Sequence, residues 1–413
     1  MKTIRKRLLC TIAVAFLIFT ASCRKSGQNI VNTSTKTSNT AKSGACIIEE
    51  TDRGFYLVSV NDDEYLYFYD EAAKTAVKTC GKANCQHNSD SCNAKFGSSG
   101  SINWYNLQFY QGKIYLWTSS SMNGVQLYSA DPDGTNHQDL GALKIDMTRG
   151  QGGIEASIIS DDMVYVLAIV GTNHLGYQYM RFYERSLEPD AEAHLIFADE
   201  DEKTTEHRMG QLVAEDGLIY FTDIAFYDGL NRMESRLYRY DPSRDELKTV
   251  LALENRRIAY TVKDQKVYYS AYDYAANAYE KVRCYDPAAG KSTDFSQTGG
   301  QITWDGKHFI ILEFEYDAVL SEKYQTAVDK PSAVVFVSED GKEEKTVPAD
   351  QLAEDPSEMN ICMSENYIYT EAYMFDPIEN KHTHEIRIFR KDDVLNGSYD
   401  AASIHFIRSM GPG

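Results

Sequence analysis

The sequence lacks the short motifs that identify many enzymes. It contains no G-x-S-x-G nucleophile elbow, no H-E-x-x-H pair, no P-loop and no dinucleotide fingerprint. Sialidase-type S-x-D-x-G-x-x-W boxes and the C-x-x-C-H motif for haem attachment are absent as well. Carboxylate pairs are abundant among the 61 Asp and Glu residues, so a glycosidase-like pair can be neither identified nor excluded.

Proline and positive charge are also scarce. Only 9 of 413 residues are proline, which excludes a proline-rich linker architecture. The 42 Lys and Arg residues leave a formal net charge of −19, and several of these positive charges lie at the extreme N-terminus. An acidic surface argues against nucleic acid and against anionic lipid headgroups as partners. Solubility alone accounts for most of this charge.

A long hydrophobic run is missing too, because Leu8–Phe19 is too short to span a bilayer as a mature helix. Basic residues precede this run, so residues 1–22 are predicted to be a secretion signal. The stretch F-T-A-S-C that ends at Cys23 resembles the lipobox of bacterial lipoproteins, although Thr20 stands where Leu is usual. The resemblance implies that Cys23 is lipidated. Cleavage by an ordinary signal peptidase just before Cys23 is the alternative.

The next segment, residues 23–44, is rich in Ser, Thr, Asn and Lys and is predicted to be a flexible tether. Residues 45–413 form the predicted folded domain. We therefore expect the protein at the extracytoplasmic face of the bacterial cell membrane, anchored through lipid on Cys23.

What the folded domain does contain is a repeat. Residues 217–251 read as three short strands joined by turns, and a fourth strand is expected just upstream at 211–214. Four antiparallel strands within about 45 residues are typical of one blade of a β-propeller.

A signature of the second strand, [GDQKN]-x-[IVF]-[YI], recurs along the chain at spacings of 42 to 59 residues. We therefore predict an all-β fold: a single propeller of seven four-stranded blades, with six or eight left open because the units vary in length. No stretch shows a sustained helical period, and a two-sheet sandwich would not explain the repeat. The predicted units are 46–80, 104–143, 153–198, 210–252, 257–296, 300–348 and 359–409.

These repeats resemble the propellers of bacterial lipoproteins with TolB-like or quinoprotein-like blades. The turn D-P-D-G-T-N at 131–136 is similar to a turn of TolB-type repeats. The stretch 75–96 resembles one found in uncharacterised lipoproteins of anaerobic gut-type bacteria, a family with no assigned activity.

The strongest chemical constellation is C-x4-C-x-H-x4-C, formed by Cys80, Cys85, His87 and Cys92. Three thiols and an imidazole could surround one tetrahedral Zn²⁺ in a closed structural site. One alternative is a disulfide with a spare thiol, which the expected compartment permits and in which Cys46 could take part, and another is that all these thiols are free. We expect a structural role in each case, at the junction of the first two units.

Aromatic residues followed by Asp recur where long loops are expected on one face. Their rings could stack on a sugar or peptide while the carboxylates accept hydrogen bonds. In the alternative interpretation, the ring ends its strand in the core and the Asp begins a turn. His382 and His384 are expected to be solvated in one of these loops. The candidate binding residues are Tyr227, Asp228, Tyr272, Asp273, Tyr316, Asp317, Phe375 and Asp376.

These observations favour a monomeric binding module for a carbohydrate, a peptide or an envelope protein, with no role for nucleic acid. An enzyme acting on a polysaccharide or peptide, with acidic residues on the long-loop face, is the alternative. Apart from a structural zinc ion, no cofactor is expected.

Overall fold

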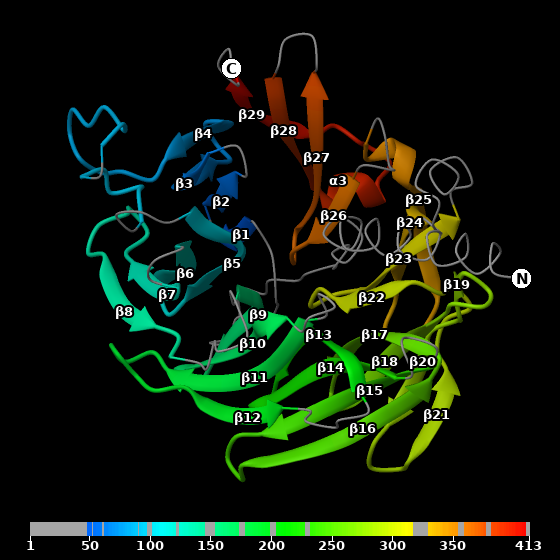
Figure 1. The fold of residues 1–413 in the computed structure, drawn as a ribbon. Coiled ribbons are helices and arrows are strands. Elements are labelled where there is room, and N and C mark those ends of the chain that lie inside the picture. The colour runs from blue at the N-terminus through cyan, green and yellow to red at the C-terminus, as the bar shows by residue number, and fades with distance from the viewer. Residues whose placement is uncertain are drawn as a thin grey trace, which may run out of the picture.

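Seven separate antiparallel sheets surround a central axis, so the chain is a seven-bladed β-propeller (Figure 1). The predicted fold class and blade number are confirmed. Cys23, Cys46, the expected signal peptide and the tether lie outside the described residues. The computed structural model describes residues 48–51, 53–59, 62–89, 91–96, 101–120, 124–144, 153–172, 178–198, 204–227, 232–316, 329–353, 359–376 and 381–409.

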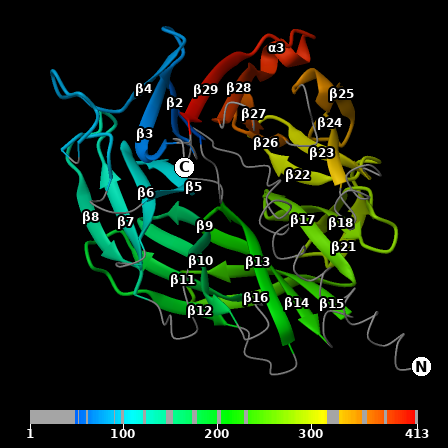
Figure 2. The ribbon, with the colours of Figure 1, turned by 45° about the horizontal axis from the view of Figure 1, so that its top comes forward.

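Each blade places its strands in chain order from the hub to the rim (Figures 1 and 2). Blades one and two comprise β1 (Ile48–Thr51), β2 (Gly54–Ser59), β3 (Asp62–Asp70), β4 (Thr75–Lys78), β5 (Ser101–Tyr110), β6 (Lys113–Ser120), β7 (Gly124–Ala130) and β8 (Gln138–Ala142). Blades three and four comprise β9 (Gly153–Ser160), β10 (Met163–Thr172), β11 (Gln178–Ser186), β12 (His194–Ala198), β13 (Thr204–Glu215), β14 (Leu218–Tyr227), β15 (Arg232–Asp241) and β16 (Glu246–Glu254).

The remaining three blades follow the same plan, and blade five has one additional short strand. Blade five comprises β17 (Arg256–Lys263), β18 (Lys266–Asp273), β19 (Ala278–Tyr279), β20 (Arg283–Asp286) and β21 (Lys291–Asp294). Blades six and seven comprise β22 (Gln301–Trp304), β23 (Phe309–Tyr316), β24 (Asp329–Val337), β25 (Glu343–Pro348), β26 (Met359–Met363), β27 (Tyr367–Asp376), β28 (Lys381–Arg390) and β29 (Ala402–Ser409). Within the described residues, the helices are η2 (Ala349–Gln351) and α3 (Lys391–Leu395), and none is long and apolar enough to cross a bilayer.

Tight turns between first and second strands explain why the hairpins form locally. In the turn Asp216-Gly217, both residues have positive φ values, of 50° and 73°. Asp264-Gln265 has the same geometry, with φ values of 52° and 59°. Two successive left-handed residues match the twist of the strands that they join, so these two-residue turns set the strand register.

The ring closes without exchange of a strand between the chain ends. Blade one contains β1 to β4 and blade seven contains β26 to β29, each in its own sheet. Their facing side chains share one buried apolar cluster, in which the ring of Phe55 stands edge-on to those of Tyr367 and Tyr369.

The prediction of a polar loop at residues 375–384, which would hold His382 and His384, is wrong. Strands β27 and β28 extend into it and pair Phe375 with His382 and Tyr373 with His384. His384 is therefore fully buried, and its Nε2 lies 3.2 Å from Oε2 of Glu371. A blade core with a partner carboxylate accommodates this imidazole, whereas the sequence pattern suggested solvent.

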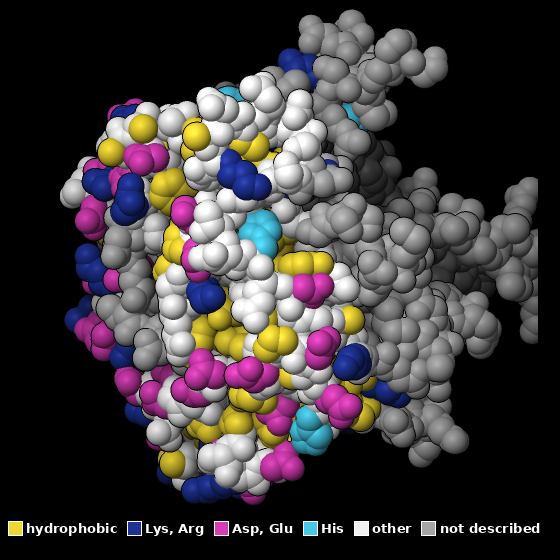
Figure 3. Space-filling view, turned by 90° about the vertical axis from the view of Figure 1, so that its left-hand side faces the viewer, with side chains coloured by type: hydrophobic (Ala, Val, Ile, Leu, Met, Phe, Trp, Pro, Cys, Tyr) yellow, Lys and Arg dark blue, Asp and Glu magenta, His cyan; other side chains and the backbone are white. Residues whose placement is uncertain are grey.

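Acidic and basic side chains are interspersed over the side of the ring that lies on the left in Figure 1 (Figure 3). Exposed large apolar residues within the described chain occur singly, at Val77, Leu195, Tyr274 and Met374. Single exposed apolar side chains are normal for a folded protein.

Candidate metal centre

The Cys/His cluster, formed by Cys80, Cys85, His87 and Cys92, lies in the connection between blades one and two. This connection leaves the rim strand β4 and leads to the hub strand β5, as expected from the sequence. It forms a loop at the outer edge of the ring (Figure 1). The loop is fixed to blade one because Leu66 N donates to Ala94 O and Thr79 N donates to Leu66 O, both at 2.9 Å.

Local turns bring the four side chains together. Cys85 N donates to Lys82 O at 3.3 Å, and Cys92 N donates to Ser89 O at 2.9 Å. Asn84 and His87 have positive φ values of 62° and 53°, which reverse the chain around the cluster. Asn and His tolerate this region better than most non-glycine residues.

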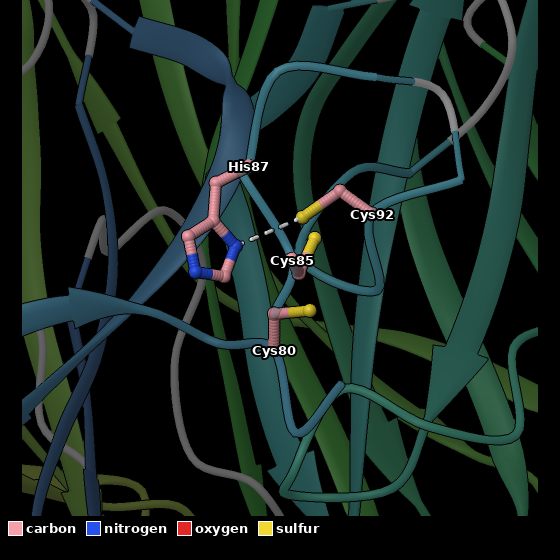
Figure 4. A group of neighbouring side chains, drawn as sticks. All are labelled: Cys80, Cys85, His87 and Cys92. Carbon is pink, nitrogen blue, oxygen red and sulfur yellow. Dashed lines mark hydrogen bonds between the residues drawn. The ribbon is translucent and has the colours of Figure 1, made fainter. Parts of the chain in front are cut away.

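The four ligand atoms converge on one point (Figure 4). Each lies within 4.8 Å of the others, and Nδ1 of His87 is 3.4 Å from Sγ of Cys92. Bonds of about 2.3 Å to a tetrahedral zinc ion would place sulfur atoms about 3.8 Å apart. Small side-chain rotations therefore suffice to complete a four-coordinate site. No position is left open for a reactant, which is the arrangement of a structural metal site.

Neighbouring backbone N–H groups favour the thiolate forms of Cys80 and Cys92. Burial alone would raise the pKa of the Cys80 thiol, but N–H donors from Lys82 and Asn93 and the neighbouring thiols outweigh it, so this pKa is lowered. Burial raises the pKa of Cys92 to about 11, although the N–H of Ala94 opposes this shift. The N–H groups of Lys82 and Ala94, two residues after Cys80 and Cys92, favour the thiolate, which is the form that binds metal.

Two lysine side chains, Lys78 and Lys82, hydrogen-bond to carbonyl groups of the loop and bring positive charge to it. Nζ of Lys78 lies 3.2 Å from the ring centroid of Tyr65 and 3.5 Å from the carbonyl oxygen of His87. Lys82 donates from Nζ to the carbonyl oxygen of Ser91 across the loop. A Zn²⁺ ion with three thiolates and a neutral imidazole carries one net negative charge, which these ammonium groups would offset.

The connection contains more apolar packing than its composition suggests. Cys92 is 2% exposed, and Ala94 and Phe96 are fully buried. The ring of Phe96 stacks on that of His137, with centroids 4.2 Å apart. Burial therefore helps to order residues 92–96. The five cysteines in the described residues are all free thiols, including the three of the cluster.

In two of the aromatic–Asp pairs, the structure describes the aromatic side chain. Tyr227 is 5% exposed, and its hydroxyl accepts a hydrogen bond from Arg236 at 2.9 Å. Tyr272 is 9% exposed and stands edge-on to Tyr274 at 5.0 Å. In this conformation, neither buried ring offers a face to a ligand.

Asp273 takes part in local structure. Its Oδ1 accepts hydrogen bonds from Ala275 N and Ala276 N, at 2.8 and 3.2 Å, and its Oδ2 lies 3.3 Å from Arg256. Asp228 and Asp317 lie outside the described residues. Tyr316, Phe375 and Asp376 end the strands β23 and β27, at the same end of the ring as Tyr227 and Tyr272. Their backbones are thus brought to one face.

Sequence reasoning did not single out Tyr274, which is 49% exposed in the connection after β18. Its signal was an aromatic residue in the short stretch that separates Asp273 from Ala278. It also missed the buried pair of His207 and Asp223, whose Nδ1 and Oδ1 atoms are 3.2 Å apart. No local pattern marks that pair, because its partners come from two neighbouring strands.

Two solved structures with TM-scores above 0.5 support the fold. A puromycin hydrolase is 12% identical and matches 89% of this chain and 54% of its own, with a TM-score of 0.54. Prolyl endopeptidases are 12% identical and match 89% of this chain and 50% of theirs, with a TM-score of 0.51. A putative TolB from Agrobacterium tumefaciens is 10% identical over 61% of this chain and 80% of its own, with a TM-score of 0.35.

This chain thus spans about half the length of the two peptidases. At these identities the likeness concerns the fold alone. No protein-family profile and no curated protein matches the chain.

Proposed function

We propose that the chain is an extracytoplasmic lipoprotein whose propeller is a binding module at the cell envelope. In this proposal, residues 1–22 direct export and lipid on Cys23 anchors the mature chain at the membrane. Residues 23–44 then form a tether that carries the propeller domain, residues 45–413. The basic start, the short apolar run and the small residues before Cys23 support this assignment.

The observation that carries the binding role is the difference between the two ends of the ring. At one end, first and second strands are joined by tight turns such as Asp216-Gly217. At the opposite end, second and third strands are joined by longer segments in blades two to seven, of which 317–328 between β23 and β24 is the longest. Loops on a rigid scaffold are the usual place for binding groups. The long-loop end is therefore the proposed binding face.

Tyr274 is the described aromatic side chain best placed to contact a ligand there. It is 49% exposed and stands edge-on to the buried ring of Tyr272, which in turn packs on Tyr279. An exposed ring held against a buried ring can stack on a sugar or a peptide with little loss of conformational entropy.

We also propose that the Cys/His cluster binds one structural Zn²⁺ ion. The convergence of four ligand atoms, the N–H donors to sulfur and the closed coordination support this role. The ion would stabilise the connection between blades one and two and would take no part in a reaction.

The binding role is tested with glycan arrays and peptide libraries, probed with the purified chain. We expect saturable binding that Tyr274→Ala weakens at least several-fold, whereas Val77→Ala, at an exposed position on rim strand β4, leaves binding unchanged. A parallel screen for hydrolase and lyase activity tests the enzyme alternative. Turnover of a polysaccharide or peptide would contradict the proposed binding role and support the enzyme alternative.

A further inference from the structure

Among the described residues, non-covalent contacts hold the interface between blades one and seven, termed the seam. Glu71 accepts hydrogen bonds from the hydroxyl of Tyr367 at 2.7 Å and from Nε of Arg390 at 2.8 Å. Nearer the hub, Nδ2 of Asn366 donates to Glu50 at 2.8 Å. Blade one therefore has a neighbour on this side to which no peptide chain joins it.

On its other side, blade one is joined to blade two by the longest connection between blades. This connection runs from Lys78, at the end of β4, to Ser101, at the start of β5. Between blades four and five, by contrast, Asn255 alone separates β16 from β17. Blade one is thus the blade with a non-covalent seam on one side and a long covalent link on the other.

The connection docks on the outer turn of blade two immediately beside the Cys/His cluster. Nε2 of His137 lies 2.7 Å from the carbonyl oxygen of Asn93, the residue after Cys92. Gly134 packs so closely that an added Cβ would lie 2.2 Å from the carbonyl oxygen of Thr79, the residue before Cys80. The first and last cysteines of the cluster are therefore each adjacent to a residue that contacts blade two.

A further hydrogen bond joins the two blades near this turn. The hydroxyl of Tyr56, on β2, donates to the carbonyl oxygen of Pro132 at 2.8 Å. The outer turn of blade two thus contacts both the connection and the sheet of blade one. Any change in the conformation of residues 79–93 will alter this contact.

We infer that the metal centre acts as a clasp that couples blade one to blade two, so that loss of the ion opens the ring at the seam. This inference rests on the proposed zinc site. With the ion bound, Thr79 and Asn93 are held in the positions that receive Gly134 and His137. Without it, the connection loosens, blade one loses its support from blade two, and the seam becomes the weakest interface of the ring.

Hydrogen exchange measured by mass spectrometry tests the inference on the full chain in detergent, with and without zinc chelation. We expect chelation to raise exchange on the order of ten-fold in blade one (48–78) and in blade seven (359–409), because local opening involves the weakest cooperative unit. Blade four (204–254) should not change. Uniform acceleration over all blades, or a change confined to residues 79–96, would overturn the clasp.

A pair of glycine variants separates docking from metal binding. Gly134→Ala should raise exchange in blade one while the chain retains its zinc, because the added methyl group meets Thr79 and no cluster residue is altered. Gly112→Ala is the matched control. Gly112 has a similar φ of 76°, against 73° for Gly134, but an added Cβ meets nothing within 4 Å. Both variants incur the cost of a left-handed alanine, so only the docking contact differs.

The outcomes distinguish this inference from the zinc proposal. If the purified chain binds no metal, both are wrong. If it binds zinc and chelation leaves the exchange of blades one and seven unchanged, the zinc site stands and the clasp is wrong. Equal exchange in Gly134→Ala and Gly112→Ala would also contradict the clasp.

Discussion

The imidazole of His87 lies against the thiol of Cys92, with Nδ1 and Sγ 3.4 Å apart, although His87 has a φ of 53°. A left-handed conformation costs a non-glycine residue about 1–2 kcal/mol. Here that conformation directs Nδ1 of the imidazole toward the sulfur of Cys92 (Figure 4). Strain that is retained where it completes a ligand set is an argument for function at that set.

The first prediction concerns the fourth ligand. His87→Ala should lower zinc affinity by at least about ten-fold, because the four-ligand site loses one bond and opens to water. His87→Cys should retain zinc, since four thiolates also form a closed tetrahedral site. Competition with a chromogenic chelator measures both affinities. Unchanged affinity in His87→Ala would remove this residue from the site.

The second prediction concerns the membrane anchor. Cys23→Ala should release the protein into the medium or leave its precursor uncleaved, because the acyl chains can no longer be attached. Cys10→Ala, within the same expected signal peptide, serves as the control and should not change localisation. Membrane fractionation and mass spectrometry of the mature N-terminus read out the result. A Cys23→Ala protein that has lost residues 1–22 and still fractionates with the membrane would contradict lipidation.

The third prediction concerns closure of the ring. Deletion of blade seven, residues 359–413, should abolish cooperative folding, because Phe55 and Tyr69 would lose the apolar cluster that they share with that blade. Removal of residues 410–413 alone should leave the melting transition in place. Circular dichroism and calorimetry make the comparison. Native-like melting of the six-blade chain would mean that each blade is stable without a closed ring.

The fourth prediction concerns a buried ion pair between blades six and seven. Lys391, in α3, donates from Nζ to Oδ2 of Asp305, and the two side chains are 5% and 0% exposed. Oδ1 of Asp305 also accepts the N–H groups of Lys307 and His308, at 2.8 and 2.6 Å. Burial lowers the pKa of Lys391, and the charge of Asp305 opposes that shift.

Asp305→Asn should destabilise the fold by about 3–5 kcal/mol, because it leaves a buried ammonium group without its carboxylate. The double variant Asp305→Asn with Lys391→Met should be more stable than Asp305→Asn alone, since it leaves no buried charge unpaired. Urea unfolding measures the difference. Asp340→Asn, in an exposed pair with Lys342, is the control and should have little effect. Equal stability of the single and double variants would show that Lys391 tolerates the loss of its partner.

Much of the propeller could be predicted because its signals are local. Turns such as Asp216-Gly217 and the alternating strands beside them depend on neighbouring residues alone. Because the same pattern recurs along the chain, recognising one blade predicts the other six. The Cys/His cluster was equally accessible, since Cys80 and Cys92 lie within one short segment.

Contacts between distant segments could not be predicted in the same way. His384 was expected in solvent, but the cross-strand neighbour Glu371 holds it in a core. Docking of Gly134 against Thr79 depends on how two blades pack, and no spacing in the sequence records it. Phe96 did carry a signal, because it is a large apolar residue in a polar stretch. Its stacking partner, His137, lies in the next blade.

Metal analysis of chain purified without chelators, combined with thiol counting after denaturation, tests the central claim most directly. The account predicts about one zinc ion per chain, with Cys80, Cys85 and Cys92 reacting as free thiols only once the metal has been removed. Cys284→Ser, which alters a thiol of blade five, should keep the ion, and Cys92→Ser should lose it. Absence of metal, together with a mass two hydrogens lower in the peptide spanning residues 80–92, would mean a disulfide and would contradict the account.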